Sequence, residues 1–253
     1  MDALTELVRV AGRALDDVVP AGPYARPDYT RAERTGIPEV ILAETKADDD
    51  LVRIVEGFLD RRARAIVSRA RPEQRALLQV GFPGVAYEEY GRGRTVVLRR
   101  SGGDAPPTGG DVGILAAGTS DLPIAEEAAV IVREMGCRVT TAYDVGVAGI
   151  HRLVEPLRAM TAGGLDVLIV AAGMDGALPS VVAGLVAVPV IGLPVSVGYG
   201  LGGQGVAALM SMLQTCAPGL AVVNIDNGVG AGATAGLIAR RAALARGEIA
   251  TLA

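Results

Sequence analysis

A glycine-rich loop and a cysteine lie at the two ends of one expected helix in the last quarter of the chain. The loop runs from Gly198 to Gly205, the helix is expected over 205–214, and Cys216 follows it. Glycine N–H groups can approach an anion closely, and the positive end of the helix dipole adds to the attraction. We therefore expect the loop to bind a phosphate and the Cys216 thiolate, facing the same anion site, to attack an electron-poor carbon. The alternative for Cys216 is an inert buried thiol.

Two aspartates follow expected strands. Asp175 comes just after the apolar run 167–172, where desolvation would raise its pKa toward that of a useful general base. The alternative is a cap for the helix expected from Pro179. Asp121 is expected to cap the helix that begins near residue 122, and its neighbours offer hydroxyl and N–H groups to a phosphate or ribose.

The second half of the chain must position these groups. Apolar strands alternate there with helical patterns, which indicates a parallel sheet covered on both faces. The strands are expected at 112–117, 138–143, 167–172, 190–193 and 221–225, and the helices at 124–135, 150–160, 179–186, 205–214 and 233–245. This is an α/β fold with three layers and a doubly wound parallel sheet, in which ligands bind at the carboxyl ends of the strands. The residues expected there to bind substrate are Gly118, Thr119, Ser120, Asp121, Asp144, Gly146, Gly173, Met174, Ser196, Gly198, Tyr199, Gly200, Gly202, Asn224 and Asn227.

The first half has a different character. Residues 1–110 carry 17 basic and 17 acidic side chains, against 7 and 11 in residues 111–253, and the Gly- and Pro-rich stretch 101–110 resembles a linker. We expect a small α+β N-terminal domain over 1–108 and the α/β domain over 109–253. The expected elements of the first are helices at 4–18, from 48 and at 72–78, strands at 40–45 and 65–68, and a hairpin of 85–90 with 94–99. Its many arginines are interpreted as a self-paired surface.

Composition excludes several classes of protein. A net charge of -4 without a basic stripe in the second half argues against nucleic acid, and the apolar runs are too short to cross a membrane. One histidine, His151, and two distant cysteines form neither a zinc site nor a disulfide framework, so we expect a cytoplasmic protein with free thiols. No dinucleotide or Walker A fingerprint indicates a tightly bound organic cofactor. Any metal would be a hard ion such as Mg²⁺, held by carboxylates and substrate phosphates.

The second half resembles the aminoimidazole ribonucleotide (AIR) carboxylase and mutase family of purine biosynthesis. The resemblance lies in Gly118-Thr119-Ser120-Asp121, the Leu178-Pro179 pair and the strand Pro189 to Pro194. That family carries an acid–base histidine immediately before its Leu-Pro pair, whereas this chain has Ala177. The purine mutase reaction is therefore not expected, although His151 could serve as a relocated acid–base group.

The whole chain resembles the LarB family, the pyridinium-3,5-biscarboxylic acid mononucleotide synthases that begin synthesis of the nickel-pincer cofactor of lactate racemase. The motifs that carry this resemblance are Asp144 to Arg152, Gly198 to Gly205, Cys216-Ala217-Pro218-Gly219 and Asn224 to Gly232. The resemblance implies carboxylation of nicotinic acid adenine dinucleotide at ring carbon C5, with carbon dioxide or bicarbonate as co-substrate. It also implies cleavage of the phosphoanhydride with release of AMP, and a homo-octamer.

The resemblance suggests roles for two catalytic residues. Cys216 would add to the pyridinium ring at C4, and Asp175 would remove the C5 proton after carbon dioxide is captured. The family usually has glutamate at the position of Asp175, so the side chain of this chain is one methylene shorter. A non-catalytic nucleotide-binding module, with Cys216 as buried packing, is the remaining alternative.

Overall fold

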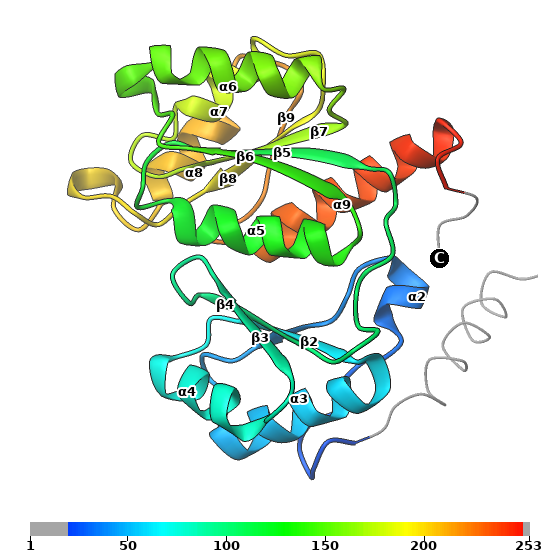
Figure 1. The fold of residues 1–253 in the computed structure, drawn as a ribbon. Helices are drawn as coiled ribbons and strands as arrows, with labels where there is room; N and C mark the ends of the chain where they lie inside the picture. The colour runs from blue at the N-terminus through cyan, green and yellow to red at the C-terminus, as the bar shows by residue number, and fades with distance from the viewer. Residues whose placement is uncertain (1–19, 250–253) are drawn as a thin grey trace, which may run out of the picture. The chain divides into compact units, whose positions relative to one another are not determined.

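The computed structural model describes residues 20–249, which form two compact units (Figure 1). One unit contains the described residues up to Glu89 together with Val96–Asp104, and the other contains Tyr90–Thr95 and the described residues from Ala105 onward. The helix expected at 4–18 lies outside the described residues. None of the helices in residues 20–249 combines the length and the apolar character needed to cross a bilayer.

The second unit is built on a five-stranded parallel sheet with the order β6-β5-β7-β8-β9. The strands are β5 (Asp111–Ala116), β6 (Arg138–Tyr143), β7 (Val167–Ala172), β8 (Val190–Pro194) and β9 (Leu220–Val222). The helices between and after them are α5 (Leu122–Glu134), α6 (His151–Ala162), α7 (Leu178–Ala183), α8 (Val206–Leu213) and α9 (Gly228–Ala245), with short 3-10 turns η1 (Val147–Gly149) and η2 (Gly200–Gly202). The expected doubly wound α/β fold is confirmed.

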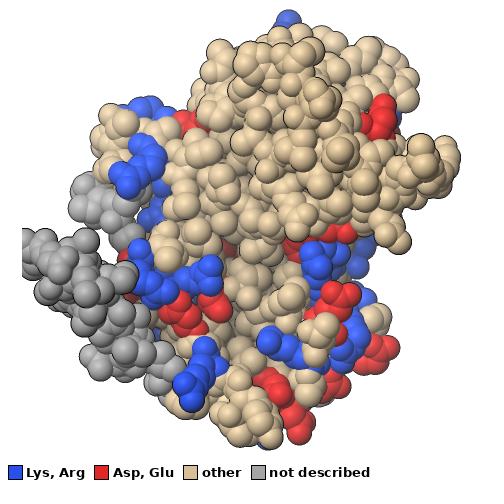
Figure 2. All heavy atoms as spheres, turned by 180° about the vertical axis from the view of Figure 1, so that it is seen from behind, with Lys and Arg blue, Asp and Glu red and all other residues tan. Residues whose placement is uncertain are grey.

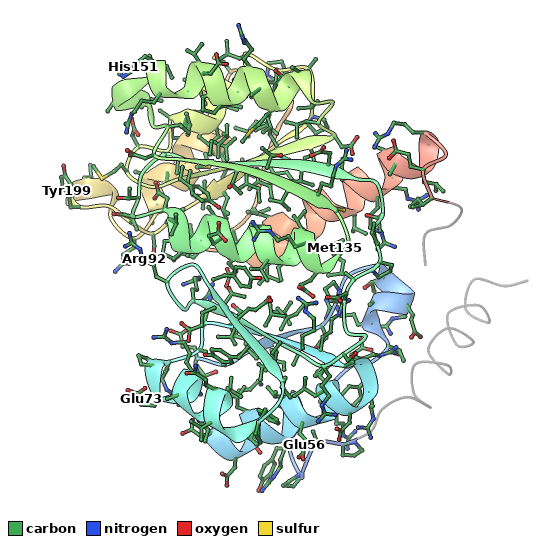
Figure 3. The ribbon with its side chains drawn as sticks, in the orientation of Figure 1. Glu56, Glu73, Arg92, Met135, His151 and Tyr199 are labelled. Atoms are coloured by element: carbon green, nitrogen blue, oxygen red, sulfur yellow. The ribbon has the colours of Figure 1, made fainter. Side chains whose placement is uncertain are left out.

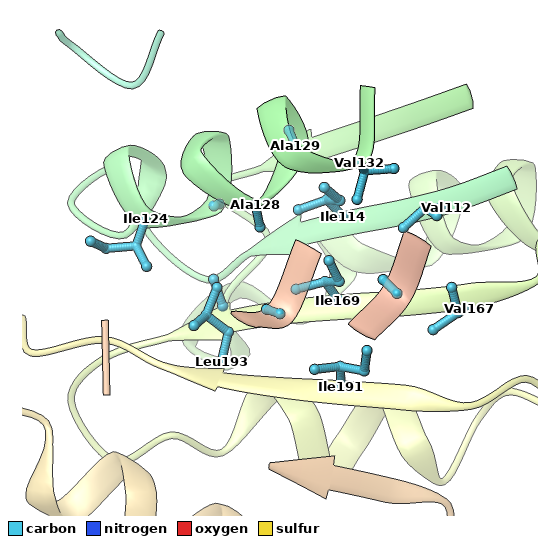
Figure 4. Close-up of a cluster of buried hydrophobic side chains, with 14 of the residues drawn as sticks. Val112, Ile114, Ile124, Ala128, Ala129, Val132, Val167, Ile169, Ile191 and Leu193 are labelled. Atoms are coloured by element: carbon cyan, nitrogen blue, oxygen red, sulfur yellow. The ribbon is translucent and has the colours of Figure 1, made fainter. Parts of the chain in front are cut away.

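Helices cover both faces of this sheet, which makes three layers (Figure 1). Side chains of α5 and α9 pack on one face against Ile114 and Ile169 (Figure 4), while those of α6, α7 and α8 pack on the other face against Leu168. All three of these strand residues are fully buried. Each such side chain contributes about 1.5–3 kcal/mol through burial, so the apolar strands hold the site-bearing loops on a rigid base.

Two elements of this unit differ from the sequence expectation. Strand β9 ends at Val222 rather than near 225, and α9 begins at Gly228 rather than near 233. The glycines in the first turns of α9 led us to expect a loop there. They are helical because α9 packs directly on α5, where a Cβ at Gly232 would lie 2.6 Å from the Ala128 carbonyl oxygen.

The first unit contains a four-stranded sheet with the order β1-β2-β4-β3, in which β1 and β2 are parallel. Its elements are α2 (Arg31–Thr35), β1 (Val40–Leu42), α3 (Asp48–Arg62), β2 (Arg64–Ser68), α4 (Pro72–Gly81), β3 (Ala86–Tyr90) and β4 (Thr95–Arg99). The short helix α2 was not expected. The α+β character of this region is confirmed.

Charged side chains gather over the first unit on the face shown in Figure 2, whereas the second unit is nearly free of them there. The arginines are paired as expected: Arg62 with Glu33 at 2.6 Å and Arg71 with Asp48 at 3.0 Å. Such exposed pairs contribute little to stability, about 0–1 kcal/mol each. They indicate a solvated surface rather than an anion site.

Candidate active site

A cavity of about 540 Å³ opens beyond the carboxyl ends of β5, β7 and β8. The expected substrate-binding residues that line it are Gly118, Ser120, Asp121, Gly146, Gly173, Met174, Gly198 and Tyr199. Asp175, the expected general base, lines it as well. The sheet has the flavodoxin-like strand order, and the cavity lies at the point where that order reverses, between β5 and β7.

Asp121 holds the floor of this cavity together. Its carboxylate accepts an N–H from Gly118 at 2.8 Å and from Gly173 at 3.1 Å, so it joins the loops after β5 and β7. Only 5% of the residue is exposed, and this burial raises the pKa of the carboxyl, partly opposed by the two backbone hydrogen bonds. Asp121 occupies the N-cap position of α5, but its side chain does not cap that helix, contrary to expectation. It is therefore a structural part of the site.

The burial of Asp121 predicts a pH dependence of stability. Because the folded-state pKa is raised, the folded chain binds a proton more tightly than the unfolded chain, and stability falls as pH rises from the ordinary aspartate pKa, about 3.9, through the raised value. The free energy of unfolding of wild type relative to Asp121→Asn should decrease across this window. Urea unfolding of both proteins at a series of pH values measures it, and a difference that is independent of pH would contradict the assignment.

Four non-glycine residues with left-handed backbones lie beyond the ends of four strands. They are Asp144 (φ 61°), Met174 (φ 52°), Gln204 (φ 60°) and Asp226 (φ 54°). Such conformations cost of order 1–3 kcal/mol each and tend to cluster at functional sites. Here they change the direction of the chain in the loops at the carboxyl ends of the strands, which form the rim of the cavity.

Further hydrogen bonds tie adjacent loops of this rim to one another. The Met174 N–H donates to the Val197 carbonyl at 2.9 Å, and the Ser196 N–H donates to the Asp226 carboxylate at 2.8 Å. Ser196 therefore supports the rim through its backbone and does not line the cavity. The loops after β7, β8 and β9 form one connected edge.

Asp175 and Tyr199 are two exposed polar residues of the cavity wall. Asp175 is exposed rather than desolvated, contrary to expectation, because it lies three residues beyond the end of the buried strand β7. The alternative of a helix cap is also wrong, since the N-cap of α7 is Ala177. Tyr199 is 82% exposed on a loop that projects from the unit (Figure 3). Both side chains are available to a ligand.

Other expected binding residues do not line the cavity. Asn227 caps α9, accepting the Gly230 N–H at 2.9 Å, and the side chain of Asn224 accepts the N–H of the next residue. These amides are used by their own loop because β9 ends early. The remaining expected residues outside the lining are Thr119, Asp144, Gly200 and Gly202.

Within one chain, Cys216 does not lie at the carboxyl ends of the strands where the cavity opens, contrary to expectation. Strands β8 and β9 are parallel, so α8 carries the chain back to their amino ends, and the Val190 N–H at the start of β8 donates to the Gly219 carbonyl at 3.0 Å. Eight residues of helix, about 12 Å long, separate the glycine loop from the cysteine. The sulfur is nevertheless exposed, whereas Cys137 is buried and both thiols are free. Cys216 is accessible but remote from its own cavity.

Arg152 is the functional residue that sequence reasoning missed. It lines the cavity from the first turn of α6, and its guanidinium pairs with the Asp144 carboxylate. The available signal was an arginine directly after a glycine-rich segment in a half of the chain with few charges. The neighbouring His151 is exposed and does not line the cavity.

No cluster of three metal-ligating side chains occurs within residues 20–249. The two carboxylates of the cavity differ, because both oxygens of Asp121 accept backbone N–H groups whereas Asp175 is exposed. A magnesium ion would therefore depend on Asp175 and the phosphates of a ligand.

A second cavity, of about 520 Å³, lies within the first unit along β1. Its charged side chains balance one another: Arg26 and Lys46 against Glu39 and Asp50. Among the described residues, its lining contains no glycine. The chemistry-bearing residues therefore select the cavity of the second unit.

The fold and cavity define an AIR carboxylase-like domain, and the sequence model of the AIR carboxylase family matches residues 111–251. A second family model, the LarB/PurE-like N-terminal domain, matches residues 19–100. The chain therefore belongs to the LarB family, with an AIR carboxylase-like C-terminal domain.

Several curated proteins are similar to this chain over part or most of its length. An uncharacterized protein of Methanocaldococcus jannaschii is 40% identical over 216 residues, which cover 84% of this chain and 83% of that protein. N5-carboxyaminoimidazole ribonucleotide mutases of the same organism and of Thermotoga maritima are 38% and 34% identical, and they match 46% and 50% of this chain and 69% and 73% of their own. The similarity supports an enzyme of the carboxylase and mutase type.

Proposed function

We propose that this protein is a pyridinium-3,5-biscarboxylic acid mononucleotide synthase. It would carboxylate nicotinic acid adenine dinucleotide at C5 and hydrolyse the phosphoanhydride to release AMP, the first step of nickel-pincer cofactor synthesis. The observation that carries this proposal is a cavity with an exposed carboxylate, Asp175, between two N–H-rich loops, in a chain that has both LarB-family domains. We also propose a cytoplasmic location, where two unpaired thiols would stay reduced.

The chemistry depends on reversing the polarity of the ring. A pyridinium is electron-poor at C5 and does not attack carbon dioxide. When the Cys216 thiolate forms a bond to C4, the ring π electrons move to the nitrogen, and C5 becomes the nucleophilic end of an enamine. C5 then bonds to carbon dioxide, Asp175 takes the C5 proton, and cleavage of the C4–S bond expels the thiolate and restores the aromatic pyridinium.

The sulfur has to come from a second copy of the chain, because Cys216 lies at the far end of α8 from its own cavity. The outer face of α8 suits such an assembly. Val206, Met210 and Leu213 are 54%, 62% and 62% exposed, and their spacing puts them on one side of the helix. An apolar face of this kind marks an interface between proteins. We propose a homo-oligomer, an octamer, in which this face carries Cys216 to a neighbouring cavity.

The diphosphate has two sets of backbone donors. The loop before α5 presents N–H groups at a helix N-terminus in the cavity wall, where the helix dipole favours an anion, and the loop before α8 contributes Gly198 and Tyr199 to that wall. Gly205 is required in the second loop, since its φ is +78° and a Cβ would lie 2.7 Å from Ile225. These groups would stabilise the charge that develops when water attacks phosphorus. Mg²⁺ bound by the diphosphate would supply further charge neutralisation.

The mutase activity of the purine enzymes is the second candidate, and the site disfavours it. Ala177 lines the cavity at the position before Leu178, where that family has its acid–base histidine. His151 does not line the cavity and cannot replace it there. Assay with carboxyaminoimidazole ribonucleotide should show no turnover.

Product analysis tests the proposal directly. Incubation of the full chain with nicotinic acid adenine dinucleotide and labelled bicarbonate should give AMP and a second product. Mass spectrometry should identify this product as nicotinic acid mononucleotide with one additional, labelled carboxylate. Asp175→Asn should lower turnover by roughly 10²–10⁴-fold, the usual loss on removing a general base. Folded wild-type oligomer that yields neither product would overturn the proposal.

A further inference from the structure

Arg152 is the only lysine or arginine among the described residues that line the cavity. The other charged side chains of the wall are the carboxylates Asp121 and Asp175. A ligand with several negative charges therefore meets a wall with more acid than base. The single guanidinium has a large influence on which anionic group is accepted.

The guanidinium is held in place with part of its donor edge unused. Its Nη1 donates to the Asp144 carboxylate, and its Nε donates to the Gly149 carbonyl at 3.4 Å. Gly149 permits this approach, because a Cβ there would lie 2.7 Å from Nε. Of the five N–H groups of arginine, these contacts use two, which leaves the planar Nη2 edge for a ligand oxygen pair.

The strand order places three polar groups of the cavity after successive strands of the sheet. Arg152 follows β6, Asp175 follows β7, and Tyr199 follows β8, while β5 lies between β6 and β7. Two strand spacings, roughly 10 Å, separate β6 from β7. Arg152 and Asp175 line the same cavity, so a bound ring could present C5 to the carboxylate and a substituent to the guanidinium.

We infer that Arg152 binds the carboxylate of the nicotinate ring and thereby selects nicotinic acid nucleotides over nicotinamide nucleotides. This inference rests on the proposed function. A neutral amide in place of the carboxylate would leave the guanidinium without its charged partner, and sites built around a charged hydrogen bond reject such analogues strongly. Asp144 is a positioning residue in this arrangement.

Binding of two mononucleotides tests the inference without catalysis. Nicotinic acid mononucleotide and nicotinamide mononucleotide share the ribose and phosphate and differ only in the ring substituent. Titration calorimetry on the wild-type oligomer should show a preference for the acid of roughly 10–100-fold. Arg152→Gln should remove this preference. It should weaken the binding of nicotinic acid mononucleotide and leave the binding of nicotinamide mononucleotide nearly unchanged.

Arg158→Gln is the matched control, because Arg158 is on the same helix, is exposed and forms an ion pair with Glu155 at 3.6 Å. It should keep the full preference. Asp144→Asn should reduce the preference without unfolding the loop, since asparagine tolerates the left-handed backbone at this position. Circular dichroism checks the fold of each variant.

Two outcomes overturn the inference. If Arg152→Gln weakens the binding of both mononucleotides equally, the guanidinium contacts the phosphate instead. If wild type shows no preference, the ring carboxylate is not recognised. The proposed function fails separately. An Arg152-dependent preference in a protein that forms no carboxylated product would retain the recognition site and refute the reaction.

Discussion

Cys216→Ser should abolish carboxylation of nicotinic acid adenine dinucleotide, with a loss of at least roughly 10⁴-fold, because the covalent step has no substitute nucleophile. The hydroxyl of serine is a far weaker nucleophile than a thiolate at neutral pH. Wild type trapped with substrate should show a mass increase equal to the dinucleotide, and the variant should show none. Labelled bicarbonate measures the carboxylation step independently of AMP release.

Cys137→Ala is the matched cysteine control for this experiment. Cys137 is buried in the sheet core, near the Thr108 hydroxyl at 3.3 Å, and burial raises the pKa of its thiol. Its removal should leave the adduct and turnover in place. An adduct that survives Cys216→Ser would refute the role of the sulfur, and protection of Cys216 from alkylation by the dinucleotide would support it.

The sequence predicted the scaffold of the site well because its signals are local. The apolar runs of β5 and β7 and their flanking helices follow from patterns within a few residues, and both strands are buried as expected. The same holds for the start of α3, where Asp48, Asp49 and Asp50 fall in the first turn. Residues directly after these strands consequently meet at one cavity.

The errors arose where the partner of a side chain is distant in the sequence. Asp121 was expected to cap its own helix, but it accepts an N–H from Gly173, 52 residues away. Cys216 is close to the glycine loop in sequence, yet the intervening helix reverses the chain and separates them in space. Such contacts require the fold before they can be identified.

Two inactive variants should restore activity to each other if the sulfur and the base come from different copies. In an oligomer that mixes Cys216→Ser and Asp175→Asn chains equally, a complete site needs the carboxylate of the first chain and the thiol of the second. Random assembly gives both in about one quarter of the sites, so about one quarter of wild-type activity is expected. A site built within one chain would give none.

The experiment requires oligomers that contain both chains. Co-expression with two different affinity tags and sequential purification isolates them, and native mass spectrometry counts the subunits. Cys216→Ser co-assembled with the double variant Asp175→Asn/Cys216→Ser contains no reactive sulfur and should remain inactive. Because α8 carries the exposed apolar face that leads to Cys216, Met210→Asp should prevent both assembly and recovery. Mixed oligomers without recovery would instead require α8 to move within one chain, and the composite site would be refuted.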